Sequence, residues 1–381
     1  MESLHPGGKR RPAVIVPIQF LRGVAASFVV AVHLLERLTR RGAFQHDLPG
    51  WVWSLGDIGV ATFFAISGFI MVHTTAGEFG IPGSGKKFFY RRLIRVAPIY
   101  YITSAAMVVF MYLTYNFSTN DAYHSPTFPE IMMSLCFIPY LGPDNISHPV
   151  YGLGWTLEYE MFFYLVFAAA LVLPRRIGLA CVIMFLLAVV AAGTLIAPPE
   201  AMVGLPVPIY YFSRPLLLYF IIGMIMAVGR LKFGTIKTRI PDGAICMFAL
   251  IALGIGVRLG PKGIDFASAV TIALAIAGVT LLESRQNRTT RLSVLSRAFG
   301  DASYSMYLTH SFFLGAIAVM VAHPAGTGPV VLIALIIATC VFCAAMAWLV
   351  WRFVEVPVTR LLATRPTYRP EVTPMLVERI D

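Results

Sequence analysis

The sequence is poor in charged residues. Only 13% of its 381 residues are charged, whereas 58% are hydrophobic and the mean hydropathy is +0.76. About a quarter of the residues of a soluble domain are charged, so this composition excludes a soluble globular protein, a disordered chain and a secreted disulfide scaffold. No stretch is long and polar enough to form a separate soluble domain. The length suits about ten membrane spans of about 20 residues each.

Motifs for nucleotide and metal chemistry are also missing. The chain has no G-x-x-x-x-G-K-S/T or G-x-G-x-x-G loop and no G-x-S-x-G elbow, which argues against ATP-driven chemistry. Of five cysteines, only Cys340 and Cys343 have metal-like spacing, and no His or second Cys pair accompanies them, so we predict no metal. The net charge of +11 fits basic residues retained on the cytoplasmic side of a membrane, and we expect no nucleic-acid binding.

The apolar runs predict an all-α polytopic membrane protein with about ten transmembrane helices. The runs cover residues 14–36, 51–74, 96–115, 154–173, 177–197, 209–229, 244–258, 265–283, 302–322 and 329–351. This divides the chain into an N-terminal tail, 1–13, a membrane domain, 14–351, and a C-terminal tail, 352–381. Within the connection 116–153, the apolar piece 131–138 is too short to span, so we expect it at the interface or re-entering the membrane.

The distribution of Lys and Arg predicts the orientation. With a cytoplasmic N-terminus, 23 of the 30 Lys and Arg residues fall in cytoplasmic segments and five in external ones; the other two, Arg22 and Arg214, lie within spans. Because cytoplasmic loops carry the excess of these residues, we predict that both tails are cytoplasmic.

Ionisable residues inside the first apolar run are functional candidates, because a charge at the bilayer centre costs about 2.5–3.5 kcal/mol. Arg22 and His33 are 11 residues apart. Eleven helical steps return to within about 20° of the start, so both side chains share one face, about 16 Å apart along the axis. The alternative is that Arg22 only reaches the inner interface and His33 only packs.

Two further runs begin with polar residues. The fourth opens with GWTLEYEMFFY, which places Trp155, Glu158 and Glu160 near the outer end, at the depth of His33. Glu158 and Glu160 cannot share a helix face, so we expect one to point inward and the other toward water. The alternative is an ordinary interfacial tryptophan with hydrated carboxylates. The ninth run opens with SYSMYLTH, whose hydroxyls ordinarily serve helix packing.

A basic cluster, KKFFYRRLIR at 86–95, lies at the predicted cytoplasmic face. Such clusters usually set topology or contact anionic lipids. The functional alternative is a phosphate site, in which guanidinium groups hold an anionic cofactor from the cytosol.

Taken together, these pieces resemble the acyltransferase-3 family of polytopic bacterial membrane acyltransferases, from about Ile18 to Arg360. The pieces that carry the resemblance, in the family's order, are LRGVAA…H, GVATFFAISGF, YRRLIRVAP, GWTLEYEMFFY, SYSMYLTH and WRFVEVP. The segments FFAISGFIMV and IRVAPIYY are most similar to those of the branch that O-acetylates exopolysaccharides. Two positions depart from the pattern, because many members have Asp at Ala61-Thr62 and Glu at Tyr219.

The resemblance implies transfer of an acyl group, acetyl foremost, from cytosolic acyl-CoA to a sugar hydroxyl outside a bacterial inner membrane. It implies His33 as general base, with Glu160 orienting His33 or holding the sugar. The residues expected to hold the CoA phosphates are Arg22, Arg91, Arg92 and Arg95. Those expected to contact the saccharide acceptor are Trp155, Glu158, Tyr304 and His310.

Other partners and mechanisms stay open at this stage. Membrane lipids and other polysaccharide-assembly proteins are expected partners. A ping-pong route through an acyl-histidine or acyl-serine is an alternative to direct transfer. The competing classes are a transporter or lipid-linked-sugar flippase, which would show internal repeats that this sequence lacks, and a non-catalytic subunit of polysaccharide export.

The charge distribution gives a direct test of topology. Reporter fusions near residues 145 and 235 should report opposite sides of the membrane, with the second in the cytoplasm. If both report the cytoplasm, the predicted orientation and the depth argument for His33 fail together.

Overall fold

The computed structural model describes most of the chain. The described residues are 15–42, 44, 48–115, 126–142, 147–195, 207–259, 266–284, 291–320 and 329–363. The predicted tail 1–13 and residues 364–381 of the predicted C-terminal tail lie outside them.

Each predicted apolar run contains a long helix. These helices are α1 (Val16–Arg40), α2 (Ser54–Thr74), α3 (Ser84–Tyr115), α5 (Trp155–Ala170), α6 (Arg175–Leu195), α8 (Leu218–Phe233), α9 (Asp242–Leu259), α10 (Phe266–Leu281), α12 (Ser303–Met320) and α13 (Pro329–Val350). Among the described residues, seven segments, those containing α1, α2, α3, α6, α8, α9 and α13, are long and apolar enough to cross a membrane, and α10 is a shorter apolar helix. The chain is therefore a polytopic helical membrane protein, and the count of ten spans stays a prediction.

Short elements join these helices. They are the 3₁₀ turns η1 (Gly50–Val52), η2 (Gly152–Gly154) and η3 (Pro215–Leu217), the helices α4 (Phe128–Leu135), α7 (Val207–Phe212), α11 (Arg291–Asp301) and α14 (Val356–Ala363), and two parallel strands, β1 (Ile236–Thr238) and β2 (Leu282–Ser284). Helix α4 lies in the piece predicted to be too short to span. It begins with a capping box in which Glu130 accepts a hydrogen bond from the backbone N–H of Thr127 at 2.6 Å.

The C-terminal end of α13 differs from the expectation that a tail begins at residue 352. The helix continues through a π-helical turn, η4 (Trp351–Glu355), into α14. Within this turn, Glu355 is buried and accepts a hydrogen bond from Ser305 of α12 at 2.6 Å. The contact holds the last helical segment against the bundle.

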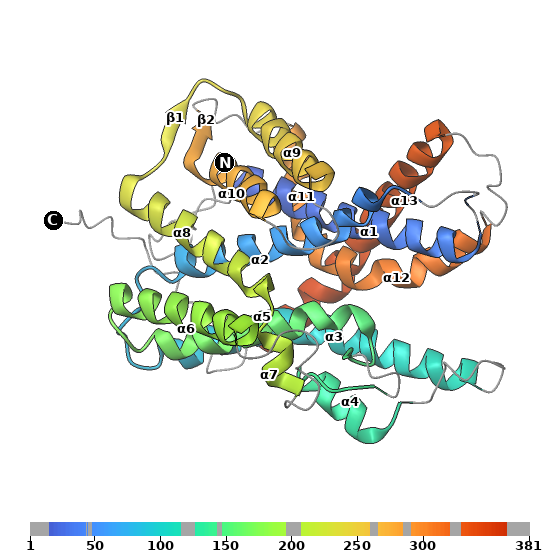
Figure 1. Cartoon of the computed structure of the whole chain (residues 1–381), viewed down its shortest axis with the longest axis horizontal. Helices are drawn as coiled ribbons and strands as arrows, with labels where there is room; N and C mark the ends of the chain where they lie inside the picture. Colours follow the sequence, from blue (N-terminus) through green and yellow to red (C-terminus); the bar gives the residue numbers. More distant parts are fainter. Residues whose placement is uncertain are drawn as a thin grey trace.

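Segments that the charge count predicts on one side do lie at one end of the bundle. Figure 1 shows the ends of α2 and α8 and the beginnings of α3 and α6 at the left, and the far ends of α1, α3 and α12 at the right. The basic start of α3 therefore lies beside the end of α2. Helix α13 diverges from the bundle in the same view, in line with its low burial.

Helix α2 packs closely against α8. A Cβ atom added at Gly68 would collide with the backbone carbonyl of Phe220, and one added at Gly223 would collide with the carbonyl of Ala65. Small residues let helix backbones approach this closely in a membrane. The crossing fixes the position of α2, whose side chains form much of the cavity described below.

This crossing predicts a sharp difference between two glycines of α8. Gly223→Ala should lower the Tm of the purified protein, because its methyl group meets backbone that cannot move aside, and overpacking typically costs about 1–3 kcal/mol. Gly229→Ala is the matched control, since nothing lies within 4 Å of an added Cβ there. Equal melting of the two variants in detergent would contradict the close α2–α8 contact.

Candidate functional site

Five helices, α1, α2, α3, α5 and α12, enclose a cavity of about 340 Å³. Along α2 its lining extends from Val60 to Thr74, which is about 21 Å at 1.5 Å per residue. Its polar lining residues are Gln19, Arg22, Ser67, Thr74, Arg92, Arg95, Thr156, Glu160, Tyr164, Tyr304 and Tyr307. The cavity therefore begins at the basic end of the bundle and reaches well into the apolar region.

Three guanidinium groups give the cavity its charge. Buried Arg22 donates to the side-chain oxygen of Gln19 at 3.0 Å, and Arg92 donates to Thr74 at 3.4 Å while lying over the ring of Phe88. Neither they nor Arg95 form an ion pair with any residue that the structure describes. Because guanidinium groups stay protonated and Glu160 is the one carboxylate in the lining, the cavity suits an anion.

Glu160 is held by hydroxyl groups. Its Oε1 accepts hydrogen bonds from Ser67 at 3.1 Å and from Tyr164. Tyr304, which also lines the cavity, donates to the carbonyl of Val96 at 2.6 Å. These hydrogen bonds fix the carboxylate and the tyrosine ring as parts of the cavity wall.

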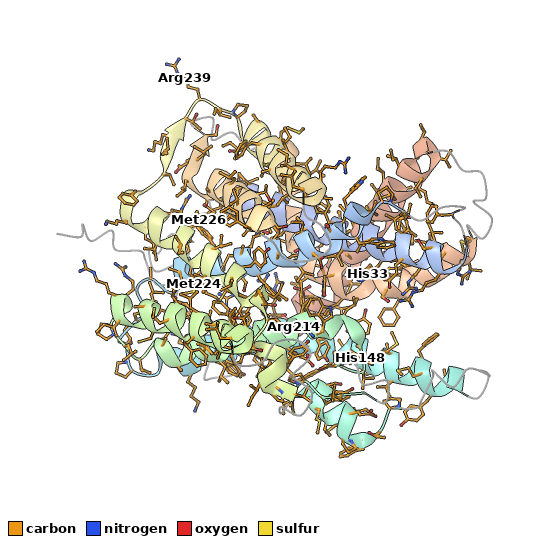
Figure 2. The ribbon with its side chains drawn as sticks, in the orientation of Figure 1. His33, His148, Arg214, Met224, Met226 and Arg239 are labelled. Atoms are coloured by element: carbon orange, nitrogen blue, oxygen red, sulfur yellow. The ribbon has the colours of Figure 1, made fainter. Side chains whose placement is uncertain are left out.

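Beyond the cavity, two imidazole rings meet. The Nδ1 of His33 on α1 lies 2.9 Å from the Nε2 of His310 on α12, and the rings are stacked at 8° with centroids 5.2 Å apart. His310 is fully buried, and its Nδ1 lies 3.1 Å from the carbonyl oxygen of Met306, one turn earlier on α12. Figure 2 shows His33 where α1 runs beside α12.

The histidine pair lies just beyond the outer end of the cavity. The side chain of Val32 packs against Gly56, so His33 lies about one helical turn beyond Val60, the outermost α2 residue of the lining. Tyr307 links the two places: it lines the cavity, and its ring centroid is 6.2 Å from that of His310. An acyl chain at the outer end of the cavity would therefore be near His33.

Five of the predicted site residues line the same cavity: Arg22, Arg92, Arg95, Glu160 and Tyr304. Arg91, expected with the phosphate-binding group, forms an ion pair with Glu78 at 2.5 Å, and its role toward a phosphate stays a prediction. One expected pairing was wrong. Glu160 does not hydrogen-bond to His33, whose partner is His310.

Trp155 and Glu158 lie elsewhere. Trp155 begins α5 and packs edge-on against the ring of Tyr159. Glu158 is only 1% exposed, so it is the glutamate that points into protein. Glu160 is partly exposed and lines the cavity, so the two carboxylates of α5 face different surroundings.

Several site residues were not predicted as such. Ser67 and Tyr164 were noted only as parts of the family resemblance, yet both bind Glu160. Tyr164 lies four residues after Glu160, which is contact spacing on a helix, so this partner was open to prediction. Tyr307 was likewise noted only within the SYSMYLTH piece, and Gln19 carried no such signal. Among the described residues, no group of three or more His, Cys, Asp or Glu is placed to hold a metal.

The fold and site define a polytopic helical membrane protein with a cationic cavity that leads to a histidine pair. The model of a known acyltransferase domain, acyltransferase-3, matches residues 16–348. The chain therefore belongs to the acyltransferase-3 family, as its sequence motifs suggest.

Two known proteins are similar to this chain over most of its length. The exopolysaccharide production protein ExoZ of Rhizobium meliloti (strain 1021) is 33% identical over 284 residues, covering 71% of this chain and 81% of that protein. The acyltransferase MdmB of Streptomyces mycarofaciens is 24% identical over 308 residues, covering 76% of each chain. No solved structure is significantly similar to this chain.

Proposed function

We propose that this protein is an O-acyltransferase of a bacterial inner membrane that moves an acyl group, most simply acetyl, from cytosolic acyl-CoA to a sugar hydroxyl of an exopolysaccharide or lipid-linked saccharide. The family supports acyl transfer. The name of the relative ExoZ supports an exopolysaccharide acceptor. The single observation that carries the proposal is the cavity, whose unpaired guanidinium groups lie at one end and whose other end approaches His33.

The charge and the length of the cavity support acyl-CoA as the donor. CoA carries phosphates at one end and the thioester at the end of a long, thin arm. In the proposed mode Arg92 and Arg95 bind the phosphates, since a guanidinium fork matches phosphate oxygens. Arg22 contacts the donor deeper in the cavity. The arm then extends along the α2 wall, past Ser67, toward Tyr307.

The reaction needs one general base. In the proposed mechanism His33 accepts the proton of the sugar hydroxyl while the hydroxyl oxygen attacks the thioester carbonyl carbon. The C–S bond breaks as the new C–O bond forms, and the CoA thiolate leaves and takes the proton back from His33. General-base catalysis of this kind contributes roughly 10²–10⁴-fold.

The proposed roles predict that substitutions of neighbouring arginines in the basic cluster change the KM for acetyl-CoA by different amounts. Arg92→Ala and Arg95→Ala should each raise the KM for acetyl-CoA roughly 10- to 100-fold, because a charge-assisted hydrogen bond contributes about 1.5–3 kcal/mol. The KM for the glycan should change little. Arg91→Ala is the matched control and should leave both constants unchanged, since Arg91 is paired with Glu78. An unchanged KM for acetyl-CoA in both Arg92→Ala and Arg95→Ala would mean that the cluster only sets topology.

The general base gives the second test. Purified protein should transfer label from radiolabelled acetyl-CoA to de-O-acetylated exopolysaccharide, and His33→Ala should reduce this turnover roughly 10²–10⁴-fold per folded molecule. Folding is checked by monodispersity in detergent.

A transporter or a non-catalytic export subunit would label no glycan even as wild type. Substantial turnover in well-folded His33→Ala would remove His33 from catalysis. A structural histidine would instead lower yield and stability together and leave specific activity nearly intact.

A further inference from the structure

The hydrogen bonds of the histidine pair have a fixed direction. The carbonyl oxygen of Met306 can only accept, so the Nδ1 of His310, 3.1 Å away, carries the proton. In a neutral imidazole the other nitrogen is then an acceptor. The Nε2 of His310 therefore accepts from the Nδ1 of His33 at 2.9 Å. This leaves the Nε2 of His33 unprotonated.

We propose that His310 is a positioning residue that holds His33 in the tautomer whose Nε2 is the base, which deepens the proposed function and rests on it. His310 is fully buried, whereas His33 is partly exposed, so His310 acts through His33 and does not contact the acceptor sugar. Its bond to Met306, on its own helix, fixes the orientation of its ring. This replaces the role in acceptor binding predicted from sequence.

The choice of a neutral partner follows from the surroundings. A carboxylate would hold the same tautomer, as it does in hydrolytic triads, but a permanent negative charge inside a membrane is costly. His310 holds the same tautomer as a neutral ring. When His33 takes the proton of the hydroxyl at Nε2, its bond to His310 becomes charge-assisted and stronger. The pair therefore stabilises the positive charge only when that charge forms.

The direct test reads protonation and does not depend on activity. In nitrogen-15 spectra of histidine-labelled wild-type protein in detergent at neutral pH, both His33 and His310 should show a protonated Nδ1 and an unprotonated Nε2. Signals are assigned by their loss in His33→Ala and His310→Leu. A protonated Nε2 on neutral His33 would overturn the proposal, whether or not the protein transfers acetyl groups.

The kinetic test separates positioning from substrate binding. With radiolabelled acetyl-CoA and de-O-acetylated exopolysaccharide, His310→Leu should lower kcat roughly 100-fold, between the effects of losing an outer-shell partner and a triad carboxylate. The KM for the glycan should stay within about twofold. His310→Gln should recover much of the loss, because its amide oxygen accepts from His33 and its NH₂ donates to Met306.

Controls keep the outcomes distinct. Thr309→Val changes the buried neighbour on the same helix, whose hydroxyl bonds only to the Ser305 carbonyl, and should leave kcat unchanged. A raised glycan KM with unchanged kcat in His310→Leu, or a Gln variant no better than Leu, would overturn the positioning role. Failure of wild-type protein to acylate glycan would overturn the proposed function instead. If His310→Leu does not fold, the wild-type spectrum and His310→Gln still decide.

Discussion

A guanidinium group that stays charged inside an apolar helix bundle constrains the whole structure. Arg22 is buried on α1 and donates a hydrogen bond to the neutral side chain of Gln19. Such a group is costly in a membrane unless it is hydrated, paired or bound to an anion. The bundle meets this constraint with a polar cavity in which Arg92 and Arg95 add further positive charge. In the proposed function, the arrangement that makes the cavity costly when empty would favour binding of an anionic donor.

Close helix packing holds this cavity open at a defined width. Gly59 lets α2 approach the backbone of α1 at Ala25, and the Gly68–Gly223 crossing brings α2 against α8. Because α2 is fixed on both sides, Ser67 is held where it binds Glu160. Backbone contacts of this kind, with no apolar driving force between helices, depend on small residues at the interface.

Much of the membrane architecture could be predicted from sequence. Apolar runs indicate which segments lie in lipid, and the charges that flank them indicate which segments lie in water. The ionisable residues inside those runs also proved informative, since Arg22 and Glu160 both line the cavity. Pairing between distant helices was not predictable. His33 and His310 are 277 positions apart, and depth alone favoured Glu160 as the partner of His33. The balance of Arg91 by Glu78 likewise depends on how the α2–α3 turn folds.

The central claim is that the donor enters from the arginine end and that the acceptor reaches His33 from the other. Its most direct test uses purified protein in sealed vesicles, with orientation determined by protease access to the loop near residue 235. Labelled acetyl-CoA is added outside, and de-O-acetylated glycan is placed either inside or outside. The account predicts product only when donor and glycan are on opposite sides and the 235 loop faces the donor. Equal labelling with both on that same side would contradict it.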